Sequence, residues 1–229
     1  MIPNATGHRK SLLDGRFRTA TARYGLYCFP AAGAVPFCSG WEDRFRGAVE
    51  LVPVGAHGSP GTVHSTDTAS SEAADEVAVD ISAARTRPML FGHGAGALLA
   101  LEVARRLEEL GAPATHLFVG GQPAPPRGRT RPPVNPLPRA GVTTIGAYRR
   151  PAPPLSCPVF AWCGSHDPAV GPSALQGWAA ETAAGLKLFV RPGGPAFLAR
   201  HADEVVRVVH DEASRLDATS PTTTDPARS

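Results

Sequence analysis

The sequence lacks the features of a membrane or secreted protein. Nowhere do eighteen apolar residues follow one another, and the N-terminal segment has no continuous apolar core of the kind that a signal peptide needs. Basic residues are spread along the chain rather than gathered in a block, and 23 Lys and Arg against 20 Asp and Glu leave a net charge of only +3. We therefore expect a soluble cytoplasmic protein whose partners include neither a membrane nor a nucleic acid.

Cysteine is scarce, and its spacing is not that of a metal site. The four cysteines, Cys28, Cys38, Cys157 and Cys163, form no CxxC pair, and three of them lie within or beside apolar runs typical of strands. This pattern favours buried free thiols over disulfides or a zinc site. We predict no bound metal and no cofactor.

The length and composition fit one α/β domain. A chain of 229 residues with 42% hydrophobic side chains is long enough for one sizeable core and too short for two full domains. We expect a disordered N-terminal arm over residues 1–22, a single domain over 23–216 and a disordered tail over 217–229. Residues 122–154, rich in Pro and Arg in their first half, form a loop that interrupts this domain.

Short apolar runs bounded by Gly or Pro predict six strands, and helical patterns lie between or after them. This alternation is typical of a mostly parallel sheet with helices on both faces, and it places ligand chemistry at the carboxyl ends of the strands. The predicted strands are Leu26–Phe29, Val49–Val54, Pro88–Phe91, His116–Val119, Pro158–Trp162 and Leu186–Val190. Further helices are predicted over Ser173–Thr182 and from Phe197 to about Leu216.

The clearest helical pattern follows the third predicted strand. Leu99, Val103, Leu107 and Leu110 recur on one stripe, which predicts a buried face, whereas Arg105 and its charged neighbours are predicted to point toward water. Gly111 and the proline that follows two residues later end the helix.

The turn before this helix reads Gly92-His93-Gly94-Ala95-Gly96. In α/β-hydrolases a strand runs through G-x-S-x-G into a helix, so that the serine nucleophile projects from a strained turn. Here Gly94 occupies the serine position. Glycine adopts such a backbone without the cost that a Cβ would bring, so the turn survives its loss of the nucleophile.

Two other interpretations fit the same glycines. The spacing of Gly92, Gly94 and Ala97 matches the dinucleotide fingerprint G-x-G-x-x-G/A, but the acidic residue expected about twenty positions later is missing from the strand that starts at His116. A glycine-rich turn that only packs a helix on a strand is also compatible with the motif.

Over most of its length, from about Tyr24 to His210, the chain resembles the type II thioesterases, discrete α/β-hydrolases that remove acyl groups from the carrier proteins of polyketide and nonribosomal peptide synthases. This likeness implies an α/β-hydrolase fold, with residues 122–154 as a shortened lid. The segments that carry the resemblance are Leu26–Ala34, Ala97–Ala104, Phe118–Gly121, Leu155–Val159 and Gly164–Val170, with Trp41, Leu175 and Trp178 at matching places.

The resemblance also implies a set of site residues. Asp167 matches the triad acid, Gly94 stands at the nucleophile position, and Pro195 replaces the family's catalytic histidine. Since neither glycine nor proline supplies a nucleophile or a base, the acyl-enzyme route is closed. The backbone N–H groups of Ala95 and of Ala32 or its neighbours are expected to form the oxyanion hole.

Three histidines are further candidates. His93 flanks the vacant nucleophile position, and the resemblance implies a packing role more than a role as base. The resemblance implies that His57 lies in a loop near the site mouth, where it is a candidate binding residue. His201 follows Pro195 by six residues, inside the last predicted helix, and is a weaker candidate for a substitute base.

Retention of the acid and the oxyanion loops favours an enzyme that acts without hydrolysis on a polyketide-like intermediate, free or carried on an acyl carrier protein. Such an enzyme would polarise a carbonyl and use Asp167 for cyclisation, isomerisation or addition. A noncatalytic pseudoenzyme that binds a carrier protein or a pathway partner is the first alternative. An atypical thioester hydrolase is the second.

Overall fold

The computed structural model describes residues 19–30, 37–45, 47–54, 67–125 and 153–219. Ala32, His57, most of the predicted arm, most of the predicted lid and residues 220–229 lie outside this part of the chain. The elements are β1 (Tyr24–Phe29), η2 (Glu42–Arg44), β2 (Val49–Pro53), α1 (Asp67–Ser82), β3 (Arg87–His93), α2 (Gly96–Glu109), β4 (His116–Gly120), β5 (Val159–Gly164), α3 (Pro172–Gln176), η3 (Gly177–Glu181), β6 (Leu186–Arg191), α4 (Phe197–Arg200) and α5 (Ala202–Thr219).

Six parallel strands form one sheet in the order β2-β1-β3-β4-β5-β6. The chain adds β2 on one side of β1 and β3 on the other, so the direction of winding reverses between β1 and β3. In open parallel sheets ligands bind at the carboxyl ends of the strands beside such a reversal. The fold therefore points to the end of β3 as the place for chemistry.

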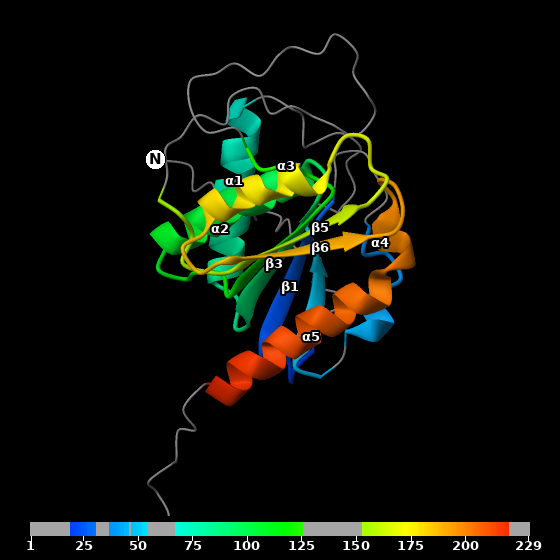
Figure 1. The fold of residues 1–229 in the computed structure, drawn as a ribbon. Helices are drawn as coiled ribbons and strands as arrows, with labels where there is room; N and C mark the ends of the chain where they lie inside the picture. Colours follow the sequence, from blue (N-terminus) through cyan, green and yellow to red (C-terminus); the bar gives the residue numbers. More distant parts are fainter. Residues whose placement is uncertain (1–18, 31–36, 46, 55–66, 126–152, 220–229) are drawn as a thin grey trace, which may run out of the picture.

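Helices cover both faces of the sheet, as the sequence predicts. In Figure 1, α1, α2 and α3 lie on one side of the strands and α5 on the other. Alternate residues of each central strand belong to two separate apolar cores, because successive side chains of a strand point to opposite faces. Aromatic rings fill the core on the α5 side, where Trp162 and Phe189 stack with centroids 4.5 Å apart.

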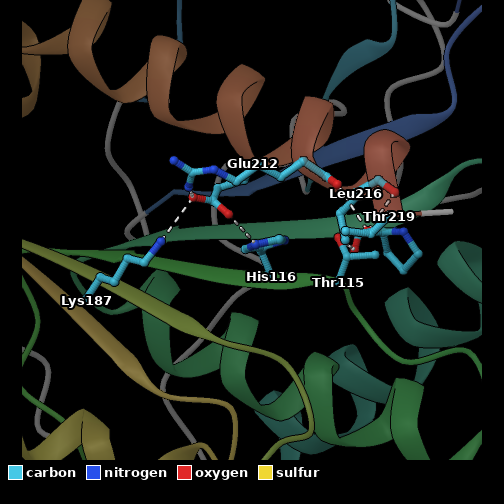
Figure 2. Close-up of polar contacts among 8 residues, drawn as sticks. Thr115, His116, Lys187, Glu212, Leu216 and Thr219 are labelled. Atoms are coloured by element: carbon cyan, nitrogen blue, oxygen red, sulfur yellow. Dashed lines mark hydrogen bonds and ion pairs between the residues drawn. The ribbon is translucent and has the colours of Figure 1, made fainter.

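A buried polar contact fastens α5 to the sheet. Figure 2 shows His116 of β4 and Lys187 of β6 pointing from the strands toward Glu212 of α5. The imidazole Nε2 of His116 lies 3.3 Å from one carboxylate oxygen of Glu212, and Lys187 donates to the other at 3.2 Å. Arg215 donates to the same oxygen as Lys187 from one turn further along α5.

All six predicted strands are present, with ends that differ by a few residues, but the helices need corrections. The sequence analysis missed α1, whose buried face combines Ala74 and Ala78 with only two larger apolar residues, Val77 and Ile81, and therefore gives a weak apolar signal. The helix predicted over 173–182 is a five-residue α-helix that continues as a 3-10 helix.

The last predicted helix differs in two ways. It is interrupted at His201, and its second part, α5, continues to Thr219. Residues 217–219, predicted as the start of a disordered tail, are thus helical, and Asp217 accepts a hydrogen bond from the hydroxyl of Tyr24 at 2.8 Å.

The predicted apolar stripe of α2 is wrong at two positions. Leu110 lies beyond the last helical turn and is 50% exposed, whereas Arg105, predicted to point toward water, is only 9% exposed. Arg105 is buried because its guanidinium donates to Glu181 of η3 at 2.5 Å. A charged side chain can face a core when a partner from another element neutralises it.

Candidate active site

The turn after β3 has the left-handed backbone that the sequence motif predicts. Gly94 has φ of +53°, a conformation that costs a residue with a Cβ between about 1 and 2 kcal/mol. Its N–H donates to the carbonyl of Gly120 at 2.9 Å, and its own carbonyl accepts from Ala97 N–H at 2.9 Å. The turn is thereby fixed between the end of β4 and the first turn of α2, and it carries no nucleophilic side chain.

The glycines on either side of the turn allow strand and helix to pack closely. A Cβ on Gly92 would lie 2.3 Å from the Cα of Ala97, and one on Gly96 would lie 2.1 Å from the carbonyl oxygen of Phe29. Neither position can hold another residue without moving the backbone. This close packing is the strand–turn–helix arrangement that the motif indicates.

Ala95 places at the site a backbone N–H that no described residue accepts from. It is the N-cap of α2, and in the described part of the chain its N–H donates to no acceptor. A helix N-terminus carries a partial positive charge, so this N–H can stabilise an oxygen that gains negative charge. The second predicted donor, Ala32, lies outside the described residues.

Asp167 stands in the turn after β5, where backbone donors hold one of its oxygens. Oδ1 accepts from the N–H groups of Ala169 at 2.9 Å and Val170 at 3.2 Å. The side chain is partly exposed, and Oδ2 has no hydrogen-bond donor among the described residues. The carboxylate is thus oriented by the turn, with one oxygen left for another group.

The loop that contains Pro195 packs directly on the turn of Asp167. The carbonyl of Gly193 accepts from the N–H of His166 at 2.9 Å, and a Cβ on Gly164 would lie 2.3 Å from the same carbonyl oxygen. Pro195 itself is exposed at the start of the turn before α4. The structure therefore packs the loop of Pro195, the residue predicted to replace the histidine, against the turn of the predicted acid.

His93, the last residue of β3, lies across the end of β4. A Cβ on Gly120 would lie 3.2 Å from the ring's Cδ2, and one on Gly121 would lie 3.2 Å from Nε2. Burial lowers the pKa of His93, and the negative charge of Asp167 partly opposes this shift. The imidazole is thus neutral at neutral pH.

His201 is engaged elsewhere. Its Nε2 lies 3.1 Å from the carbonyl oxygen of Pro192, so the ring points to the loop between β6 and α4. His57 lies outside the described residues. The sequence analysis included Gly120 and Gly121 in a segment that resembles the family but missed their role, which is to leave space for the ring of His93.

The described residues contain no group of three or more His, Cys, Asp or Glu side chains placed to hold a metal ion. None of the helices in the described part is both long and apolar enough to cross a membrane.

Sequence comparison decides the family. The profile of the thioesterase domain matches residues 25–155, more than half of the 229 residues, and this span includes the turn at Gly94. The chain belongs to the thioesterase-domain family. The match ends before Asp167 and Pro195, so the roles predicted for those two residues stay predictions. No curated protein sequence matches the chain.

Solved structures of thioesterases are similar to this chain over most of its length. RedJ, a thioesterase from the prodiginine biosynthetic pathway in Streptomyces coelicolor, is 28% identical with a TM-score of 0.67, covering 84% of this chain and 87% of its own. The type II thioesterase BorB from the borrelidin biosynthetic cluster is 25% identical with a TM-score of 0.72, covering 90% and 98%. YbtT, a type II thioesterase from the yersiniabactin pathway, shares the fold at 18% identity and a TM-score of 0.66, covering 90% and 99%. The resemblance to type II thioesterases and the predicted fold class are confirmed.

Proposed function

We propose that this protein is a non-hydrolytic member of its family that acts on a polyketide-like intermediate, either free or carried on an acyl carrier protein. The observation that carries the proposal is the turn at Gly94. Its left-handed backbone and its ties to Gly120 and Ala97 keep the architecture of a nucleophile turn, while the residue itself offers no nucleophile.

The hydrolytic route needs two groups whose positions are occupied here by other residues. Acyl transfer requires a side-chain nucleophile and a base within hydrogen-bond reach of it. Gly94 has no side chain, and Pro195 has neither a titratable group nor a backbone N–H. With both groups lost, a covalent acyl-enzyme does not form at this turn.

The remaining groups suit chemistry on a carbonyl that stays intact. The free N–H of Ala95 can hold a carbonyl oxygen and stabilise the charge that develops on it. The carboxylate of Asp167 can accept or return a proton through Oδ2. Isomerisation, cyclisation and addition all use this combination, and none requires an acyl-enzyme.

The solved relatives support the part of the proposal that places the protein in natural-product biosynthesis. RedJ and BorB both come from biosynthetic pathways of natural products. This chain shares their fold and has glycine at the position predicted for the nucleophile. This is the reason to seek its substrate among the intermediates of such pathways.

Deletion of the gene in the producing strain, followed by mass-spectrometric profiling, tests the proposal. We expect an intermediate to accumulate that differs from the product by an isomerisation, a ring closure or the addition of one molecule. Complementation with the native gene restores the product, whereas complementation with Asp167→Ala does not. Asp211→Ala is the matched control, because Asp211 is an exposed carboxylate on α5. If Asp167→Ala fully restores the product, Asp167 takes no part in the mechanism.

One observation favours the alternative of a noncatalytic binding protein. The two backbone donors to Oδ1 of Asp167 are those of a structural turn, which would hold the carboxylate even if it had no chemical role. Under this alternative Asp167→Ala supports production, and charge reversals around the site weaken co-purification with the carrier protein. The two readouts separate the alternatives.

An atypical hydrolase makes a third prediction. The purified chain would then release free thiol from an acetyl thioester of N-acetylcysteamine faster than buffer does. We expect no such release from the native protein.

A further inference from the structure

The imidazole of His93 occupies a space that only glycine leaves open. His93 pairs with Gly120 across the β3–β4 ladder, and its Cδ2–Nε2 edge faces the backbone of Gly120 and Gly121. Any side chain at those two positions would lie within about van der Waals contact of the ring, since a Cβ would already approach to 3.2 Å. The ring therefore extends from β3 over the end of β4, the strand that neighbours β5 and its following turn with Asp167.

Two aromatic rings flank this imidazole. Phe37 lies 5.5 Å from it between ring centroids, and Phe197 lies 6.4 Å from it. Phe197 follows Pro195 by two residues and begins α4, so the loop of the vacated catalytic histidine supplies one wall. His93 is thus half-buried between the turn of Gly94 and the Pro195 loop.

Among the described histidines, His93 is the one without a hydrogen bond. His116 and His166 are paired with Glu212 and with the hydroxyl of Ser165. The Nε2 atoms of the other two lie near backbone carbonyls, those of Pro192 for His201 and Arg44 for His210. In the described part of the chain neither ring nitrogen of His93 has a partner, and its Nε2 is buried.

Asp167 is the charged group that acts on this ring. Its negative charge favours the protonated imidazole, while burial between aromatic rings favours the neutral one, and burial is the larger effect. The resting ring is therefore neutral and able to accept a proton, and the resulting imidazolium would be stabilised by Asp167.

We infer that His93 is the proton-transfer residue of the proposed function, and that the substrates carry a C–H bond next to the carbonyl held by Ala95. This inference rests on the proposed function. The C–H bond breaks, its electron pair forms the C=C bond of an enolate, and the carbonyl oxygen takes the negative charge beside the N–H of Ala95. The proton moves to Nδ1 of His93, the nitrogen across the ring from Gly120. It then returns to another carbon of the same conjugated system, so atoms and electrons balance without an oxidant.

The but-3-enoyl thioester of N-acetylcysteamine is the probe. Its conversion to the conjugated crotonyl thioester moves one proton and is followed by absorbance, and the same reaction in D₂O is followed by NMR. We expect the native protein to catalyse the conversion, and His93→Phe and His93→Gln to reduce the rate about 100-fold or more. His93→Phe keeps an aromatic ring between Phe37 and Phe197. His210→Gln is the matched control and keeps the native rate, because His210 contacts the carbonyl of Arg44 and the ring of Phe45 and none of the site residues named above.

The pH profile separates proton transfer from a structural role. The rate should have an acid limb: it should fall as the pH drops through the pKa of His93, because only the neutral ring accepts a proton. Because the charge of Asp167 raises that pKa, Asp167→Asn should move the acid limb to lower pH. NMR titration of the His93 ring signals, assigned from their loss in His93→Gln, should show the same displacement.

The outcomes distinguish the inference from the proposed function. If the native protein converts the probe and both His93 variants do so at a rate within about threefold of the native rate, the inference is overturned. The proposed function then stands. An acid limb and a ring titration that are unchanged in Asp167→Asn also overturn the inference. A native protein that moves no proton in the probe also overturns the inference, and the deletion experiment then decides the proposed function separately.

Discussion

The imidazole Nε2 of His116 lies 3.3 Å from the carboxylate of Glu212, so the first residue of β4 contacts the middle of α5 through a polar pair inside the core. The His116 ring also stacks on Phe118, with centroids 5.6 Å apart. Figure 2 shows His116 and Lys187 on opposite sides of the Glu212 carboxylate. Lys187 further lies over the ring of Phe160, at 4.5 Å from its centroid.

This pair predicts that stability falls in mild acid. Burial lowers the pKa of His116 below the ordinary value, with Lys187 and Arg87 acting in the same direction and Glu212 opposing them. The unfolded chain, in which histidine titrates near 6.5, therefore binds more protons than the folded one between the two pKa values. Stability should be fully present above about pH 6.5 and should decrease as the pH drops through that window.

Urea unfolding between about pH 5 and about pH 8 measures the effect. The variant His116→Phe preserves the aromatic packing and should show a smaller slope of unfolding free energy against pH. An equal slope in His116→Phe and the native protein would mean that His116 does not contribute.

Gly94→Ala should destabilise the fold without abolishing it. The left-handed backbone at φ of +53° imposes a cost of about 1 to 2 kcal/mol on a residue with a Cβ. Gly171→Ala is the control, because Gly171 has φ of −86° and open space where a Cβ would be; alanine there carries no cost of a left-handed backbone and loses only the modest N-cap preference for glycine, so it should destabilise less than Gly94→Ala. Urea unfolding of both variants checks the difference, and equal stabilities would contradict the backbone argument.

The ion pair of Arg105 and Glu181 should be strongly coupled. Their side chains are 9% and 2% exposed, and removal of one partner leaves the other charge buried, which costs about 3 to 5 kcal/mol. Glu181→Leu and Arg105→Met should each be severely destabilising, whereas the double variant should lose much less than their sum. A double-mutant cycle in urea measures the coupling.

The exposed pair of Arg44 and Asp203 provides the comparison. These side chains are 41% and 92% exposed at a separation of 2.7 Å, and solvent screening limits such a pair to at most about 1 kcal/mol. Asp203→Ala should therefore be nearly silent. Additive losses in the Arg105 and Glu181 variants would show that their pairing contributes little.

Thiol reactivity should depend on unfolding. All four cysteines are free and buried, and burial raises the pKa of Cys157 to about 12. A chromogenic disulfide reagent should therefore react slowly with the native protein at neutral pH and label four thiols once it is unfolded. Rapid labelling of the native protein would contradict the observed burial.

Local patterns were sufficient for the strands and for the turn at Gly94. The strands were found because each is a short apolar run bounded by Gly or Pro. The turn was found because its glycines follow the spacing of G-x-S-x-G. In the structure Gly92 and Gly96 allow close packing, and Gly94 has a positive φ. The helix α1 was missed because alanine and serine give little apolar contrast between its faces.

The sequence by itself determined the succession of strands and helices and the absence of a nucleophile at the turn of β3, because both follow from residues adjacent in the chain. Only the tertiary structure decided which distant side chains meet. It buried Arg105 against Glu181, 76 residues away, and brought the Pro195 loop onto the turn of Asp167. It also laid the ring of His93 over Gly120 and Gly121, since β3 and β4 are neighbours in the sheet. Such contacts arise from packing the sheet and its helices into one core, and no local pattern specifies them.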